Sequence, residues 1–235
     1  MKAVIVIPAR YASTRFPGKP LVPIAGVSLI QRVYQQASKA RRADSVYVAT
    51  DDGRIADHVR SFGGRVAQPD GDFQSGTDRI AASLDLLDGS FDQVVNVQGD
   101  EPLIDSRSID AVIETLQSTG VDMATLACPF EDESERRSGD VVKVVTDLQG
   151  VALYFSRAPL AGARRHVGLY GYQTQVLRTL AALPASPLER AESLEQLRAL
   201  QNGFRIRVLQ TDKPHFGVDR PEDVLRVEQE LARHG

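Results

Sequence analysis

The first hundred residues alternate between two hydrophobic patterns. Short runs rich in β-branched residues occupy 4–7, 45–50 and 93–97, and each predicts a strand that is buried on both faces of a sheet. Between the first two, apolar residues recur at helical spacing over 29–37, with Ser28 as the expected N-cap. Repeated strand–loop–helix units of this kind predict an α/β fold with a doubly wound, mostly parallel central sheet.

The pattern changes after about residue 120. Runs of strand character follow one another with few helical patterns between them, at 121–127, 141–146, 151–155 and 167–172. A long helical pattern then covers 188–200, and Pro221 opens a terminal helix. We therefore expect all 235 residues to form one unit, with a core of about 1–129 and 203–235 and a smaller mixed lobe of about 130–202.

The composition excludes several classes of partner. The net charge is −3, and no run approaches the roughly 18 apolar residues of a membrane-spanning helix, so neither nucleic acid nor a membrane is expected as a partner. The first strand begins by residue 3, which leaves no room for a signal peptide. Cys128 is the lone cysteine and cannot form an internal disulfide. These features predict a cytoplasmic protein.

A basic loop follows the first strand. Pro8 ends the strand, and Arg10, Arg15 and Lys19 come within the next eleven residues. The carboxyl ends of parallel strands are where α/β folds bind ligands, and a cationic loop there favours a polyphosphate. The chain contains neither the P-loop motif nor the Rossmann glycine fingerprint, which disfavours a dinucleotide-dependent dehydrogenase. On spacing alone, a solvated basic loop explains these cations equally well.

Two acidic turns are expected near this loop. Asp100 directly follows the third core strand, within Gln98-Gly-Asp-Glu-Pro102, and Asp219 precedes the terminal helix. A carboxylate at this edge of the sheet can hold Mg²⁺ together with phosphate oxygens. Taken alone, an aspartate in an ordinary strand-to-helix turn is the commoner case.

The basic loop and the acidic turns resemble the signatures of the sugar nucleotidyltransferases in their cytidylyltransferase form. Further blocks match in the same order over almost the whole chain: Ser75-Gly-Thr-Asp-Arg79, Asn96-Val-Gln-Gly-Asp-Glu-Pro102, Val142-Lys-Val-Val145, Ala152-Leu-Tyr-Phe-Ser-Arg157, His166-Val-Gly-Leu-Tyr-Gly-Tyr172, Leu194-Glu-Gln-Leu-Arg198 and Gly217-Val-Asp-Arg-Pro-Glu-Asp223. The resemblance implies the nucleotide-diphospho-sugar transferase-like variant of the Rossmann fold. In that fold the core binds the nucleotide, and the lobe binds the sugar and contributes to an interface.

The resemblance also implies a reaction. The branch that matches most closely joins CTP to 3-deoxy-D-manno-octulosonate (Kdo), giving CMP-Kdo and pyrophosphate for lipopolysaccharide biosynthesis. The acceptor hydroxyl attacks the α-phosphate in line, with Mg²⁺ as cofactor, and catalysis relies on positioning and charge neutralisation. The implied partners are the small molecules CTP and Kdo and a second copy of the chain in a homodimer.

Individual residues acquire expected roles from the resemblance. The catalytic set is Arg10, Lys19, Asp100 and Asp219, of which Asp100 and Asp219 are the metal ligands. The nucleotide-binding set is Ala9, Arg10, Arg15, Lys19, Ser75, Gly76, Arg79, Gln98 and Asp100. The acceptor-binding set is Gln98, Arg157, His166, Tyr170, Glu195 and Gln196. The planar fork of Arg157 suits the carboxylate of a keto sugar acid.

Several alternatives stay open. The acceptor is Kdo or a related acid such as 8-amino-Kdo or a sialic acid, and a catalytically silent nucleotide-binding protein of the same fold is the rival from another class. Glu195 and Gln196 also fit the solvated face of an amphipathic helix over 188–200, and His166 fits a structural role. The segment 158–165 is shorter than is typical of the family, which affects the expected dimer geometry.

Overall fold

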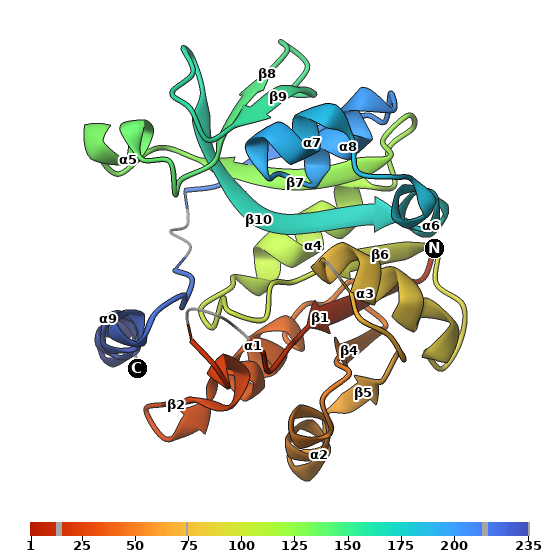
Figure 1. Cartoon of the computed structure of the whole chain (residues 1–235), viewed down its shortest axis with the longest axis vertical. Coiled ribbons are helices and arrows are strands. Elements are labelled where there is room, and N and C mark those ends of the chain that lie inside the picture. The colour runs from red at the N-terminus through yellow and green to blue at the C-terminus, as the bar shows by residue number, and fades with distance from the viewer. Residues whose placement is uncertain (13–15, 74, 213–215, 235) are drawn as a thin grey trace.

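The computed structural model describes residues 1–12, 16–73, 75–212 and 216–234, and helices lie on both sides of one large sheet (Figure 1). The strands are β1 (Ala3–Pro8), β4 (Ser45–Ala49), β5 (Arg65–Ala67), β6 (Gln93–Asn96), β7 (Met123–Cys128), β8 (Lys143–Thr146), β9 (Ala152–Ser156), β10 (Arg164–Gln173) and β11 (Ile206–Gln210). A separate small hairpin consists of β2 (Pro23–Ile24) and β3 (Val27–Ser28). The helices are α1 (Leu29–Ala37), α2 (Gly53–Ser61), α3 (Gly76–Ser83), α4 (Ser106–Thr115), α5 (Glu133–Arg137), α6 (Thr174–Ala182), α7 (Pro187–Glu192), α8 (Gln196–Gln201) and α9 (Pro221–His234), with 3₁₀ turns η1 (Lys19–Leu21) and η2 (Leu84–Leu86). None of the helices in the described ranges combines the length and the apolar character that crossing a membrane requires.

The strand order confirms the predicted α/β class. The main path runs β11-β7-β10-β6-β1-β4-β5, with β8 attached to β10 and β9 to β8. Strand β1 is parallel to β4 and β6, β5 is parallel to β4, and β11 is parallel to β7. Among the described strands of the main path, only β10 runs antiparallel to its neighbours, so the central sheet is mostly parallel, as expected.

The alternation of side chains along β1 explains the helices on both faces. Ile5 and Ile7 point to one face and join the apolar cluster formed with α1, α2 and α4. Val4 and Val6 point to the other and join the cluster formed with α3, α6 and α8. A strand buried on both faces must be apolar at every position, which is why 4–7 reads as a continuous β-branched run.

The position of strand β10 differs from that expected for a separate lobe at 130–202. It lies in the central sheet between β6 and β7, although its sequence neighbours β8 and β9 extend away from that sheet (Figure 1). Buried apolar residues alternate along this long antiparallel strand. Its register is set by this pattern and by pairing with its two neighbouring strands, not by its position in the sequence. The division into core and lobe stays a prediction.

The pattern over 188–200 does not form the single helix that was predicted. Helix α7 begins with a capping box between Ser186 and Glu189 and has Pro187 in its first turn. It ends at Glu192, and its C-cap residue Ser193 has a φ of 54° in the left-handed region. Helix α8 then begins at Gln196, with Glu195 as its N-cap residue. The left-handed residue turns the chain, so the two short helices do not share one axis.

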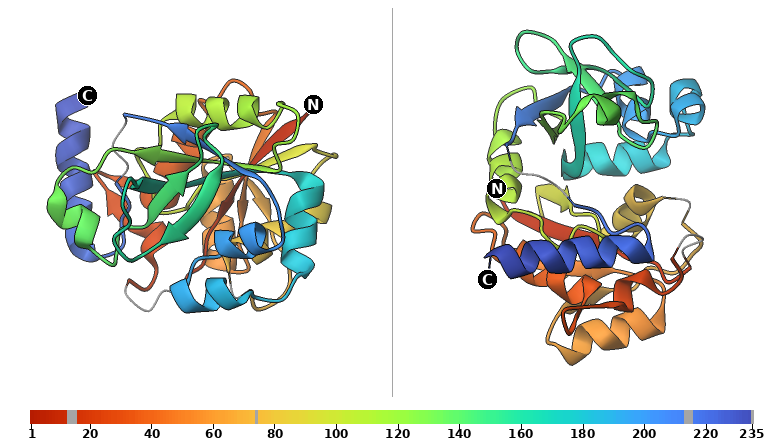
Figure 2. Two further views of the ribbon diagram at one scale, coloured as in Figure 1. Left: turned by 90° about the horizontal axis from the view of Figure 1, so that it is seen from above. Right: turned by 90° about the vertical axis from the view of Figure 1, so that its left-hand side faces the viewer.

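Helix α9 returns to the N-terminal half of the molecule. It packs beside β2 at the N-terminal half of the molecule (Figure 2). Val227 of α9 is buried in the same apolar cluster as α1. The chain just before α9 lies against the turn after β6, because the Val218 N–H donates to the Asp100 carbonyl at 2.9 Å. This contact brings the two predicted acidic turns together.

Candidate active site

Two adjoining cavities lie at the carboxyl edge of β1 and β6. The loop cavity, of about 270 Å³, is lined by the turn after β1, by Lys19 and by the residues around Asp100. The lobe cavity, of about 460 Å³, is lined by residues of β10, by the α7–α8 turn and by Arg157. The residues common to both walls are Gly76, Gln98, Glu195 and Asp219. A ligand in one cavity can therefore reach a ligand in the other.

The basic loop forms one wall of the loop cavity. Ala9 is buried at the end of β1 and Arg10 is exposed on the cavity. Lys19 is the first residue of η1 and follows Gly18. The φ of 72° at Gly18 favours glycine, which has no Cβ to clash in the left-handed region. The Gly18 N–H donates to the Tyr11 carbonyl at 3.0 Å and so closes the loop. The predicted site residue Arg15 lies outside the described residues.

Lys19 bridges the two acidic turns. Its Nζ lies 2.8 Å from Asp100 Oδ2 and 3.4 Å from Asp219 Oδ1. The Asp100 turn is tight, because a Cβ on Gly99 would lie 2.7 Å from the Pro8 carbonyl oxygen. Two carboxylates separated by 119 positions in the sequence thus converge on one cation at the loop cavity.

The electrostatics of this cluster favour a cation. Burial raises the pKa of the Asp100 carboxyl, the Lys19 ammonium opposes that change, and the neighbouring Glu101 and Asp219 carboxylates add to it. Hard carboxylate oxygens directed at a cation position fit Mg²⁺. Within the described ranges no group of three or more His, Cys, Asp or Glu side chains is arranged around a metal position. In proteins Mg²⁺ is commonly held by one or two carboxylates together with phosphate oxygens.

The N-terminus of α3 forms a second wall of the loop cavity. Ser75 is the N-cap residue, with its Oγ accepting from the Asp78 N–H at 3.1 Å. Gly76 follows, and a Cβ there would lie 3.2 Å from Pro8 Cγ. Arg79 is buried on α3, and its Nη1 lies 2.6 Å from Asp51 Oδ1. The predicted nucleotide-binding residues 75, 76 and 79 therefore lie beside Ala9, Arg10 and Lys19.

Arg157 lies on the lobe cavity and is held on two sides. Its Nε donates to the Glu192 carbonyl at 3.1 Å and its Nη1 to the Gly139 carbonyl at 3.1 Å. The Arg157 N–H also donates to the Glu192 carboxylate at 2.9 Å. These contacts fix the guanidinium plane, and Nη2 has no hydrogen bond to a described residue.

His166 and Tyr170 both lie on β10. The register of β10 against β7 shifts between Val167 and Tyr170, which is a bulge of the kind that redirects side chains beside ligand sites. His166 Nε2 lies 2.9 Å from Thr125 Oγ1, and its ring packs 5.3 Å from that of Tyr170. Burial raises the pKa of Tyr170 well above its ordinary value, so its hydroxyl stays neutral.

Glu195 and Gln196 occupy the start of α8. Gln196 is only 6% exposed, so the alternative of a solvated helix face is wrong for this residue. Its Nε2 is buried on the lobe cavity without a hydrogen-bond acceptor among the described residues. Glu195 presents its exposed surface to both cavities. Desolvation by the surrounding protein raises the pKa of its carboxyl, and the nearby Thr77 and Ser75 side chains oppose this change.

The structure adds residues that the sequence analysis did not single out. The lobe cavity is also lined by Thr77, Asn96, Asp140, Arg165, Tyr172 and Arg198. Asn96 is 2% exposed at the end of β6, and a buried amide in a run of valines was a signal that could have been used. Arg165 and Arg198 gave no such signal, because arginines beside charged neighbours usually lie on a solvated surface.

Two ligand cavities at the carboxyl edge of a mostly parallel sheet, one of them cationic with paired carboxylates, define a nucleotide-handling α/β protein. Comparison with known proteins agrees, since the family model described as Cytidylyltransferase matches residues 4–206. The chain belongs to the cytidylyltransferase family, and within it to the group of the 3-deoxy-manno-octulosonate cytidylyltransferases. The resemblance stated from the sequence is thereby confirmed.

Individual relatives support this assignment. The 3-deoxy-manno-octulosonate cytidylyltransferase of Syntrophotalea carbinolica is 50% identical, over 98% of this chain and 99% of that protein. The protein of the same name from Anaeromyxobacter sp. is 48% identical, over 98% and 97%. A solved structure of CMP:2-keto-3-deoxy-manno-octonic acid synthetase complexed with CTP has a TM-score of 0.95 and 38% identity, with both chains fully covered. A 4-diphosphocytidyl-2C-methyl-D-erythritol synthase, at 18% identity and a TM-score of 0.70 over 98% of this chain and all of that one, shares the fold alone.

Proposed function

We propose that this protein joins CTP and Kdo to give CMP-Kdo and pyrophosphate. The observation that carries the proposal is Lys19, held between Asp100 and Asp219 in the loop cavity, with Asp219 also lining the lobe cavity. Nucleotidyl transfer needs cations around a triphosphate, an acceptor in line with the α-phosphate, and little covalent help from the protein. The two adjoining cavities supply those places.

The loop cavity takes the nucleotide in this proposal. Arg10 and Lys19 bind the phosphate oxygens and neutralise the charge that passes to the leaving pyrophosphate. Arg15 of the same loop is proposed to assist them. The exposed backbone N–H groups at the start of α3, beside Ser75 and Gly76, suit the polar groups of the nucleotide, and Arg79 is the proposed base contact.

Asp100 and Asp219 are the proposed Mg²⁺ ligands. When bound, Mg²⁺ offsets charge on the phosphates and on the attacking hydroxyl. The part of the protein is to hold two carboxylates at one position in a partly buried setting, where a cation is favoured. Lys19, in contact with both, keeps the pair compensated before substrates bind.

The lobe cavity takes the sugar acid. Arg157 is proposed to bind the carboxylate of the acceptor with the donors that Glu192 and Gly139 leave free. The unpaired Gln196 Nε2 calls for an acceptor oxygen, as a polyhydroxylated sugar provides. Gln98, His166, Tyr170 and Glu195 line the same cavity and are proposed to bind further hydroxyls. We further propose that the enzyme is a cytoplasmic homodimer serving lipopolysaccharide biosynthesis.

Pyrophosphate release tests the proposal. The purified protein is assayed with Mg²⁺ in all combinations of the four nucleoside triphosphates with Kdo, 8-amino-Kdo and sialic acid. Release with CTP and Kdo alone is the expected result, and Asp100→Asn serves as the inactive control. Release with CTP and another acid would move the acceptor assignment. CTP binding without release in any combination would favour a silent nucleotide-binding protein and overturn the proposal.

A further inference from the structure

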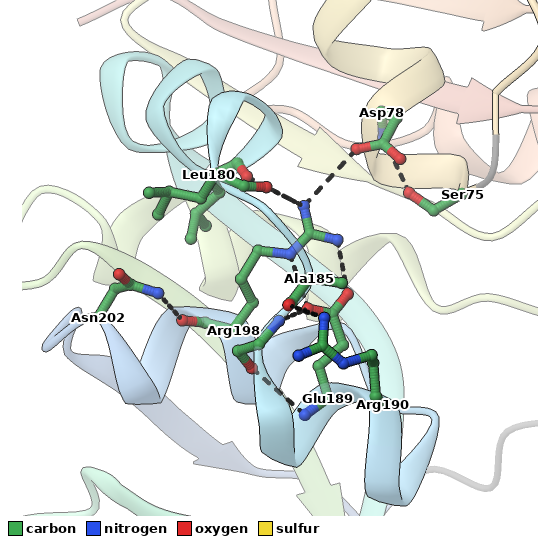
Figure 3. Close-up of polar contacts among 10 residues, drawn as sticks. Ser75, Asp78, Leu180, Ala185, Glu189, Arg190, Arg198 and Asn202 are labelled. Carbon is green, nitrogen blue, oxygen red and sulfur yellow. Dashed lines mark hydrogen bonds and ion pairs between the residues drawn. The ribbon is translucent and has the colours of Figure 1, made fainter.

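Arg198 has no role in the proposed reaction, yet its side chain is only 11% exposed and joins several elements. Its Nε and Nη2 bind both carboxylate oxygens of Glu189 in α7, at 2.8 and 2.5 Å. Its Nη1 donates to the carbonyls of Leu180 and Leu183 at the end of α6, at 3.1 and 3.3 Å. Figure 3 shows the guanidinium at the centre of these partners. One side chain on α8 thus ties together α6, α7 and α8.

The same guanidinium also reaches the N-terminal half of the chain. Arg198 Nη1 lies 3.9 Å from Asp78 Oδ1, in the first turn of α3 (Figure 3). The Asp78 N–H is in turn bound to Ser75 Oγ, so this carboxylate belongs to the turn that carries Ser75 and Gly76. Arg198 therefore contacts the turn that carries Ser75 and Gly76, two residues of the loop-cavity wall.

Helix α8 carries the residues whose placement depends on this contact. Glu195 is its N-cap residue and Gln196 its first residue, three and two positions before Arg198. The left-handed Ser193 precedes them, so the α7–α8 turn and the Glu189–Arg198 pair set where the helix begins. Glu195 faces the same gap, where Thr77 and Ser75 of the α3 start favour its ionised form. The Arg198–Asp78 ion pair thus connects α8 to the first turn of α3.

The two hydrogen bonds from Arg198 to Glu189 lower the entropy cost of the contact between Arg198 and Asp78. A free surface arginine loses rotamer entropy when it forms an ion pair, and this loss cancels most of the gain. Arg198 has already lost that freedom, because two parallel hydrogen bonds hold its planar fork on Glu189. The attraction to Asp78 can then act on the position of α8.

We propose that Arg198 is a positioning residue that clamps α8 to α3 through Asp78. The clamp keeps Glu195 and Gln196 of the lobe cavity at a fixed distance from the nucleotide side of the site. It acts on the alignment of acceptor and nucleotide, and it contacts neither reacting atom. The kinetic part of this inference rests on the proposed function.

Asp78→Asn tests the clamp with little change of shape, and Asp85→Asn is the matched control. Arg178 of α6 pairs with Asp85 of η2 at 2.6 Å, which is also a contact between these two halves. That pair is exposed, and neither residue lines a cavity. Asp78→Asn is expected to raise the KM for the acceptor and to lower kcat, each by about three- to tenfold, at an unchanged Tm. Asp85→Asn is expected to leave all three unchanged. Equal behaviour of the two variants would overturn the inference.

A double-mutant cycle shows whether Asp78 acts through Arg198. In an Arg198→Met background, Asp78→Asn is expected to cause no further loss, because its partner is already gone. A full additional loss would assign the effect of Asp78 to another partner and refute the clamp. Arg198→Lys, which keeps the charge and loses the fork, is expected to restore part of the activity of Arg198→Met. It also covers the case in which Arg198→Met folds poorly.

Hydrogen exchange separates this inference from the proposed function. Amides of residues 194–201 are expected to exchange faster in Asp78→Asn than in the wild type or in Asp85→Asn, whatever the substrate. Faster exchange in a protein that releases no pyrophosphate with any pair of substrates would refute the function and keep the clamp. Unchanged exchange in an active enzyme would refute the clamp and keep the function.

Discussion

Gln196→Met is the most direct test of the lobe cavity, because Gln196 is buried and its Nε2 has no acceptor among the described residues. Methionine has nearly the same length and needs no hydrogen bond. The variant therefore removes the polar donor and keeps the volume.

The expected magnitude has two parts of opposite sign. An unpaired buried donor costs about 1–3 kcal/mol, so removing it should stabilise the protein without ligands by about 1 kcal/mol. In a chain of this size that gain raises Tm by roughly 2–4 °C. Loss of the hydrogen bond to the acceptor costs about 1–2 kcal/mol, which is roughly a 5- to 30-fold rise in the acceptor KM.

Two measurements check this prediction. Thermal unfolding gives the stability of the protein without ligands, and steady-state pyrophosphate release gives the KM for CTP and for the acceptor separately. The KM for CTP should stay at the wild-type value, because Gln196 lines the lobe cavity and not the loop cavity. A variant with unchanged Tm and unchanged acceptor KM would show that the donor is satisfied in solution and does not bind the acceptor.

Two further predictions concern the charged groups. Burial raises the pKa of Asp100 in the folded protein above its value in the unfolded chain. The free energy of unfolding therefore falls as pH rises from the ordinary carboxyl range through the folded pKa, because the buried carboxyl becomes ionised. Asp100→Asn should therefore abolish turnover and yet raise Tm above that of the wild type near pH 7. This gain in Tm should shrink toward about pH 4, where the wild-type carboxyl is protonated. A Tm difference that grows on acidification would contradict the raised pKa of Asp100. Arg157→Ala should raise the acceptor KM by roughly 10- to 100-fold and spare the KM for CTP, since it removes charge-assisted hydrogen bonds made to the acceptor alone. An unaltered acceptor KM in steady-state assays would place the carboxylate contact elsewhere.

The parts of the fold that follow from local rules were predictable. The β-branched run over 4–7 forms β1, Pro8 ends it, and Ser28 caps α1 with its side chain accepting from the Gln31 N–H. Buried parallel strands must be apolar at each position, and helix N-caps need a side-chain acceptor. Short stretches of sequence are therefore enough to predict these elements. The carboxyl edge of the sheet then located the basic loop and Asp100.

The features that the sequence did not predict depend on single backbone states or distant partners. One left-handed residue, Ser193, divides 188–200 into two helices and moves Glu195 from a helix face to an N-cap position. The antiparallel place of β10 between β6 and β7 depends on long-range pairing. The Arg198 side chain is only 11% exposed because Glu189 of α7, Asp78 of α3 and the end of α6 surround it, and no local sequence pattern encodes contacts with such distant partners.

Lys19 provides a last prediction, because it occupies the position where the two carboxylates converge. A triphosphate in the loop cavity attracts its ammonium, and Asp100 and Asp219 are then left uncompensated in a setting that already raises the pKa of Asp100. Carboxylates in that state take up a proton or a divalent cation. Binding of CTP and of Mg²⁺ should therefore each strengthen the other by the same factor.

Lys19→Met separates the two effects. The variant removes a phosphate contact, so calorimetry should show weaker binding of CTP, by roughly tenfold for one charge-assisted contact. It also removes the cation that competes for Asp100 and Asp219, so Mg²⁺ alone should bind more tightly than to the wild type. Opposite changes in one variant would not follow from a general disturbance of the loop, which would weaken both ligands. Weaker or unchanged binding of Mg²⁺ would mean that Lys19 does not occupy the cation position, and the pairing of Asp100 with Asp219 as metal ligands would lose its support.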